Sequence, residues 1–126
     1  MPRIRSHDQG FVGAPPAQVY EVLADLHSYP AWWPGTEESA EGIGIPLRRS
    51  PARMTADRHR NHVGLHLVSR DEDLEWYLEP FDDGAIVNVF LEIDAHSRRA
   101  PRRLLAMRGA IRRGLVGLKR RLEGSS

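Results

Sequence analysis

The sequence predicts an α+β fold in which a curved antiparallel sheet of six or seven strands wraps around one long C-terminal helix. Two short helices are expected after the first strand. Apolar residues at helical spacing between Arg98 and Glu123 indicate the long helix. Most of the preceding chain alternates apolar and polar residues, as half-buried strands do. A curved antiparallel sheet needs a second layer over its concave face, so the helix is expected to fill it in a helix-grip arrangement. The helix stripe consists of Leu104, Met107, Ile111, Leu115, Leu118 and Leu122.

Charge is divided unevenly between the two parts of this arrangement. Residues 1–97 contain 16 acidic and 8 basic residues, whereas residues 98–126 contain 10 basic residues and one acid, Glu123. A negative sheet can neutralise a positive helix, and we favour this pairing within the chain over a surface for an anionic partner. Arg108 is unusual because it lies inside the apolar arc, between Leu104 and Leu115.

The N-terminal half is expected to contain one strand and two short helices. The strand runs from Arg3 to Gly13, with Ile4 and Val12 on one face. Pro15 and Pro16 end it and begin a helix, because proline is tolerated in the first helical turn. The Tyr29-Pro30 pair is expected to break the chain before a second short helix at Ala31-Trp32-Trp33, which ends at Pro34-Gly35.

The remaining strands follow from alternation. Thr36 to Ile45 is expected to be a polar, exposed strand. The clearest pair is Leu74 to Pro80 and Ala85 to Asp94, separated by the turn residues Asp82-Asp83-Gly84. A loop of two or four residues would put Trp76 and Leu78 on the same face as Val87 and Val89, and this is our prediction. The two other predicted strands run from Ala52 to Arg60 and from His62 to Arg70.

Length and composition favour one soluble domain. The chain has 126 residues and no cysteine, which excludes disulfides, thiolate catalysis and cysteine metal sites. No apolar run is long enough to span a membrane, and the charged start of the chain does not resemble a signal peptide. We therefore expect a cytoplasmic protein, present as a monomer or a homodimer.

Four segments resemble a known family. They are VGAPPAQVYEVLAD (residues 12–25), YPAWWP (29–34), WYLEP before Asp83-Gly84 (76–80) and LVGLKRRLE (115–123). In order and spacing they are similar to the polyketide cyclase/dehydrase-like branch of the START-like (SRPBCC) superfamily. The resemblance implies one START-like domain over residues 1–126. It does not imply one reaction, because the superfamily includes aromatase/cyclases and lipid and sterol carriers. No catalytic set of a cyclase is matched residue by residue.

A ligand pocket between sheet and helix is the sharpest functional prediction. Its ligand would be a small apolar or aromatic molecule, polyketide- or lipid-like, since such molecules bind concave apolar surfaces with few polar groups. Arg108 would be the polar anchor for a carboxylate or phenolate. In the alternative interpretation the aromatic residues are core, and Arg108 reaches past the stripe to water. The predicted lining consists of Trp32, Trp33, Met54, Arg58, Leu67, Trp76, Val89, Met107, Arg108 and Ile111.

Two other functions stay open. One is an aromatase/cyclase or dehydratase, which needs an acid or base inside the pocket. The predicted buried faces offer only Arg58, Ser69 and Arg108, and no Asp, Glu or His. The other is an interaction module that uses the basic face of the long helix.

Metal and nucleic-acid sites are not expected. His59, His62 and His66 are the candidate metal ligands, but His59 lies across a turn at Asn61 and the three imidazoles do not converge. No glycine-rich phosphate loop is present, and we expect no cofactor. Aromatic residues do not alternate with the helix arginines, as they do on many nucleic-acid-binding surfaces.

Overall fold

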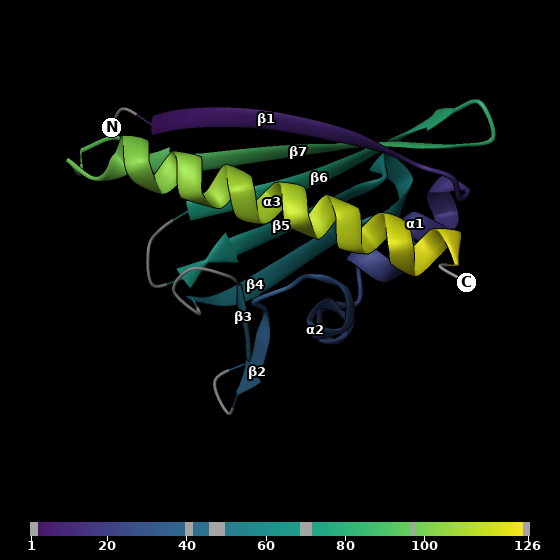
Figure 1. Cartoon of the computed structure of the whole chain (residues 1–126), viewed down its shortest axis with the longest axis horizontal. Helices are drawn as coiled ribbons and strands as arrows, with labels where there is room; N and C mark the ends of the chain where they lie inside the picture. Colours follow the sequence, from purple (N-terminus) through teal and green to yellow (C-terminus); the bar gives the residue numbers. More distant parts are fainter. Residues whose placement is uncertain (1–2, 40–41, 46–49, 69–71, 97, 125–126) are drawn as a thin grey trace.

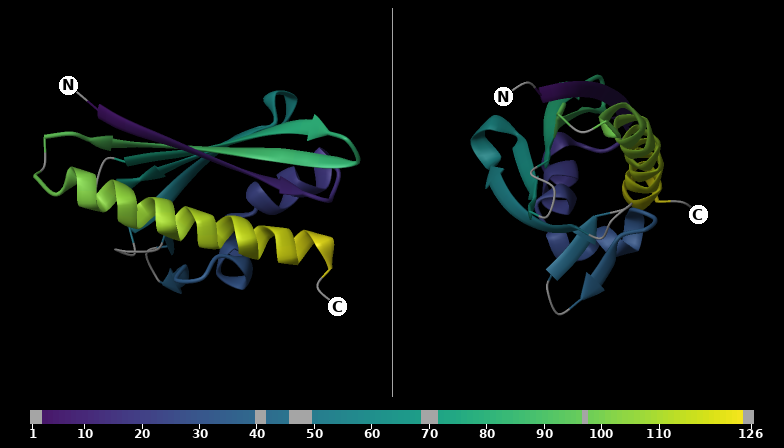
Figure 2. Two further views of the ribbon diagram at one scale, coloured as in Figure 1. Left: turned by 45° about the horizontal axis from the view of Figure 1, so that its top comes forward. Right: turned by 90° about the vertical axis from the view of Figure 1, so that its left-hand side faces the viewer.

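The computed structural model describes residues 3–39, 42–45, 50–68, 72–96 and 98–124. Their arrangement confirms the predicted helix-grip fold: seven strands form one antiparallel sheet, and a long helix crosses its concave face (Figures 1 and 2). The sheet order is β1-β7-β6-β5-β4-β3-β2. The elements are β1 (Arg3–Val12), α1 (Pro16–Leu23), η1 (Leu26–Ser28), α2 (Tyr29–Trp32), β2 (Glu37–Ser39), β3 (Gly42–Ile45), β4 (Ser50–Asp57), η2 (Arg58–Arg60), β5 (His62–Leu67), β6 (Glu72–Phe81), β7 (Gly84–Asp94) and α3 (Ala100–Glu123).

The β6–β7 register confirms the predicted hairpin. Trp76 pairs with Val89, and Phe81 pairs with Gly84, which leaves a two-residue loop. The first loop residue, Asp82, has a φ of 51°, a left-handed conformation that Asp tolerates better than most residues. Directly paired residues share a face, so Trp76 and Val89 both point to the inner face of the sheet, the concave face toward α3.

Two boundaries differ from the sequence prediction. The chain is not broken at Tyr29-Pro30; α2 begins at Tyr29 and includes Pro30 in its first turn, where no hydrogen bond is lost. The expected single strand over residues 36–45 is two strands, β2 and β3, which pair with each other. Ile43 and Ile45 are buried rather than exposed, because both belong to the core.

Parts of two predicted elements lie outside the described residues. β5 ends at Leu67, and positions 69 and 70 of the predicted strand lie outside the described residues. Ser97, which directly precedes the predicted long helix, lies outside them as well. The residue that precedes α3 is Arg99, which makes no capping hydrogen bond with its side chain.

Helix α3 is held by close contacts with the segment around α2. The indole nitrogen of Trp33 donates to the carbonyl oxygen of Ala110 at 2.9 Å. A Cβ at Gly114 would lie 3.0 Å from the Trp33 ring, and one at Gly117 would overlap the carbonyl oxygen of Trp32. Gly117 therefore lets the helix touch the Trp32 backbone, and Gly114 lets it lie closely against the Trp33 ring.

A buried ion pair fastens the N-terminal half of α3. Arg103 donates through Nε and Nη2 to the two carboxylate oxygens of Glu72, both at 2.7 Å. Glu72 lies on the inner face of β6, and the Arg103 and Glu72 side chains are only 10% and 4% exposed. Such a two-pronged pair fixes both position and orientation of the helix.

Replacement of Gly117 by alanine should destabilise the fold by about 2 kcal/mol or more, because the added methyl group cannot fit beside the Trp32 carbonyl. Gly109→Ala is the matched control: its Cβ meets only the end of Arg113, at 3.6 Å. It should be neutral or stabilising by up to about 1 kcal/mol, from helix propensity. Urea denaturation measures both, and equal stability of the two variants would contradict the close contact.

Glu72→Leu should lower the free energy of unfolding by about 3 kcal/mol, because Arg103 loses its partner in a buried site. The double variant Glu72→Leu/Arg103→Met should recover to within about 1 kcal/mol of the wild type. Urea denaturation of the three proteins tests this. A double variant as unstable as the single one would show that the stability comes from another feature of these side chains.

Candidate functional site

Most of the predicted pocket residues form the centre of the core. Each of six is at most 1% exposed, so water has almost no access to them. A ligand could touch these residues only if side chains moved. The six are Trp33, Leu67, Trp76, Val89, Met107 and Ile111.

An aromatic cluster packs between α2, the sheet and α3. Trp32 and Trp33 stack with ring centres 5.9 Å apart, and each meets Trp76 edge-on. Tyr29 packs against both of these neighbouring tryptophans and donates its hydroxyl to the Leu23 carbonyl oxygen at 2.6 Å. Burial raises the pKa of the Tyr29 phenol far above its usual range, so it remains a hydrogen-bond donor.

Other apolar residues that pack against the core remain partly exposed. Met54 pairs with Leu65 and therefore points to the inner face, yet it is only half-buried. Ala52, on the same face of β4, and Leu104 on α3 are half-buried too. At these positions the apolar core has an open border.

The predicted polar anchor, Arg108, is already paired. Asp8 lies opposite Val89 in the β1–β7 register and so points to the inner face. Its carboxylate accepts from Arg108 Nε at 3.3 Å and Nη2 at 3.4 Å, and from Arg112 Nε at 3.4 Å. The expectation that no carboxylate faces the interior is therefore wrong, for Asp8 and also for Glu72. Alternation of β1 from Ile4 could have identified Asp8, because both occupy even positions of the strand.

Arg58 is on the outside of the molecule. Its expected place on a buried face is wrong because β4 ends at Asp57 and the chain turns into η2. Its side chain is 61% exposed, forms an ion pair with Glu21 and lies 4.9 Å from the Tyr20 ring centre. Ser69, the other polar residue expected inside, lies outside the described residues.

The histidines of the sheet lie on its convex face. His62 is 2.9 Å from Glu75, and His66 is 2.9 Å from Asp73. A turn was expected at Asn61, and Asn61 adopts the left-handed conformation there. In the described ranges no group of three His, Asp or Glu side chains is placed to hold a metal ion.

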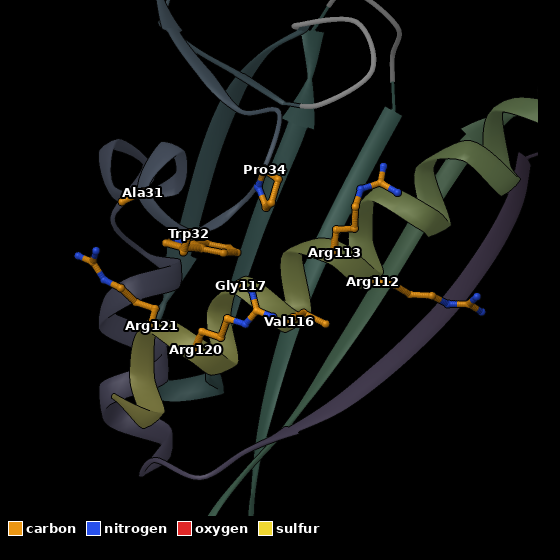
Figure 3. Close-up of a pocket in the computed structure, with 9 residues that line it drawn as sticks. All are labelled: Ala31, Trp32, Pro34, Arg112, Arg113, Val116, Gly117, Arg120 and Arg121. Atoms are coloured by element: carbon orange, nitrogen blue, oxygen red, sulfur yellow. The ribbon is translucent and has the colours of Figure 1, made fainter. Parts of the chain in front are cut away.

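An open groove lies beside α3 on its other side. Of its residues, Trp32 was expected in the ligand pocket, and Arg113 and Arg120 belong to the basic helix face that the sequence left open as an interaction surface. The groove's volume is about 630 Å³, and it runs between α2 and the C-terminal half of α3 (Figure 3). Pro34 and Val116 supply exposed apolar surface, whereas Trp32 lines the groove but is only 4% exposed. The remaining lining residues are Ala31, Arg112, Arg113, Gly117, Arg120 and Arg121.

The groove is strongly cationic. Arg112 shares the Asp8 carboxylate, but Arg113, Arg120 and Arg121 form no ion pair with the described residues. Arg113 and Arg120 are seven positions apart, which puts both on one side of the helix. That spacing was the sequence signal for this site.

No helix in the described part of the chain is long and apolar enough to cross a membrane.

Comparison with solved structures shows how widely this fold is shared. KanY superimposes with a TM-score of 0.76 at 18% identity, covering 98% of this chain and 100% of that chain. The Zhui aromatase/cyclase from Streptomyces sp. R1128 gives 0.69 at 18%, covering 99% and 100%. A START superfamily protein from Mycobacterium smegmatis gives 0.69 at 15%, covering 94% and 97%. At these identities the likeness concerns the fold.

Comparison with curated proteins gives no match. The family comparison is decisive: residues 12–110 match the family described as polyketide cyclase/dehydrase and lipid transport. This range runs from the end of β1 to the middle of α3 and therefore includes most of the inner face. The chain belongs to the polyketide cyclase/dehydrase and lipid transport family.

Proposed function

We propose that this protein binds a small apolar or aromatic molecule, polyketide- or lipid-like, between the sheet and α3. The observation that carries the proposal is the open border of the apolar core at Met54 and Leu104. Apolar side chains that pack against the core yet remain reachable by solvent are what an apolar ligand covers on binding. Family membership supports the same class of function.

The charges around this space favour a neutral ligand. Arg103 and Arg108 both face the sheet, and each is already paired with a carboxylate. An anionic group would have to displace Glu72 or Asp8, which would leave a carboxylate unpaired in a poorly solvated site. We therefore place a neutral ring or chain against Met54 and Leu104, in contrast to the carboxylate or phenolate expected from the sequence.

The same ion pairs bear on the enzyme alternative. Asp8 on β1 and Glu72 on β6 are carboxylates of the inner face beside α3, and arginines occupy their oxygens. A cyclase or dehydratase would need one of them to accept a proton during the reaction. Since that requires breaking an ion pair first, binding without catalysis is the function that this geometry favours.

Native mass spectrometry of the purified protein, followed by a thermal-shift screen of neutral flavonoids, sterols and aromatic polyketides, tests the proposal. We expect at least one class to raise the melting temperature. Met54→Lys should weaken its binding about tenfold or more, because it puts a charge at the open border. Arg53→Ala, next along β4 on the exposed convex face, is the control and should bind normally.

Two results would contradict the proposal. One is a screen in which none of these classes binds. The other is a ligand whose affinity is the same in wild type and in Met54→Lys, since it would then lie elsewhere on the protein.

A further inference from the structure

We propose that the groove between α2 and α3 is a second binding site, specific for a phosphate monoester that carries a flat apolar group. The site is separate from the inner space described above and is independent of the function proposed there. Its ligand is anionic, whereas the inner space favours a neutral molecule.

The groove is a built feature with a fixed wall. Gly117 lies in its centre and is held against the Trp32 backbone so closely that no Cβ would fit. The next residue, Trp33, donates a hydrogen bond from its indole nitrogen to the Ala110 carbonyl oxygen of α3. Trp32 is fixed as well, because its indole nitrogen donates to Ser28 Oγ at 3.2 Å. A volume of about 630 Å³ between such rigid walls is within the usual range for small-molecule sites.

The arginines are placed around an apolar centre. Figure 3 shows the Trp32 ring and Pro34 facing α3, with Arg113 and Arg120 on the helix side and Arg121 at the opposite end of the hollow from Arg113. Arg113 and Arg120 are about 10 Å apart along the helix axis, two turns from each other. Gly117 lies between them and has no side chain to occupy the space that they border.

The charge of the groove is not compensated. Arg113, Arg120 and Arg121 form no ion pair with the described residues, in contrast to Arg103, Arg108 and Arg112 of the same helix. The position of Arg120 and Arg121 in the last turn is favourable for the helix dipole, but Arg113 is in the middle of the helix and gains nothing from it. Three guanidinium groups around one hollow, none of them paired within the described chain, favour an anion.

The chemistry of the lining narrows the ligand. Two guanidinium groups can each bind a phosphate group through two hydrogen bonds, because a phosphate monoester offers three terminal oxygens and nearly two charges. The exposed side chains of Pro34 and Val116, together with the small exposed part of the Trp32 indole, provide an apolar surface for a flat ring. A molecule with both a phosphate group and a ring would contact the arginines and the apolar residues at once. Either group alone would contact only one of these two parts of the groove.

The probe is 1-naphthyl phosphate, measured by isothermal titration calorimetry on the full chain. We expect it to bind about tenfold or more tightly than three control compounds. 1-Naphthol lacks the anionic group, inorganic phosphate lacks the ring, and 1-naphthoate has a carboxylate without the third oxygen. In NMR spectra the Trp32 indole signal should shift on addition of the probe. A phosphate-free naphthol that binds equally well would overturn the proposal, as would a probe that does not bind.

The variants Arg113→Gln/Arg120→Gln and Arg98→Gln/Arg102→Gln remove the same charge from two parts of the C-terminal segment. All four side chains are exposed and form no ion pair with the described residues, so both proteins should fold normally. The first pair of substitutions should weaken the binding of 1-naphthyl phosphate about tenfold or more, and the second pair should leave its affinity unchanged. Equal losses would mean attraction by net charge alone and would overturn the site.

Two further measurements distinguish binding in the groove from binding in the inner space and from attraction to a membrane surface. Met54→Lys, which alters the inner space, should bind 1-naphthyl phosphate as the wild type does, and a loss there would overturn the groove as its site. Vesicles of phosphatidylcholine with and without phosphatidic acid test whether the phosphate belongs to a membrane lipid. Binding to phosphatidic acid vesicles without binding of the soluble probe would overturn the proposal of a small-molecule ligand.

Discussion

The contact between α3 and the backbone around α2 is the constraint on which the rest of the structure depends. It requires glycine at position 117 and nearly so at 114, because the helix passes within atomic contact of Trp32 and Trp33. This contact sets the depth of the helix on the sheet. It also brings the aromatic cluster into the core and forms one wall of the groove (Figure 3). A substitution that disturbs the contact between α3 and α2 would therefore affect the core and the groove together.

Electrostatics divides α3 into two halves with different roles. In the first half, Arg103 and Arg108 pair with carboxylates on the inner face of the sheet, as the opposite charges of the two chain segments predicted. In the second half, Arg113, Arg120 and Arg121 have no such partner in the described chain. One helix thus neutralises the acidic sheet and also carries a cationic groove. Charge counting alone could not distinguish these roles, since it treats all ten basic residues of the segment alike.

The two proposed sites differ in the same physical terms. The inner space is bordered by Met54 and Leu104, and its arginines are already satisfied, so it suits an uncharged molecule. The groove has exposed apolar side chains, Pro34 and Val116, and guanidinium groups without an ion-pair partner in the described chain, so it suits an anion that carries an apolar ring. In these two proposals the polar anchor that was expected inside the fold lies instead on the outer side of the helix, on residues a turn or more beyond Arg108.

Local sequence patterns predicted most elements of this protein and the pairing of one hairpin. Alternation and turn chemistry predicted the β6–β7 hairpin and its pairing, and helical periodicity predicted α3, because both signals depend on neighbours in the chain. Tertiary structure alone decided which inward residues form solid core, that Asp8 occupies Arg108, and that Arg58 lies outside. It also decided that a groove opens beside Gly117. These features depend on distances between residues far apart in the chain, such as Asp8 and Arg108, and periodicity carries no information about those distances.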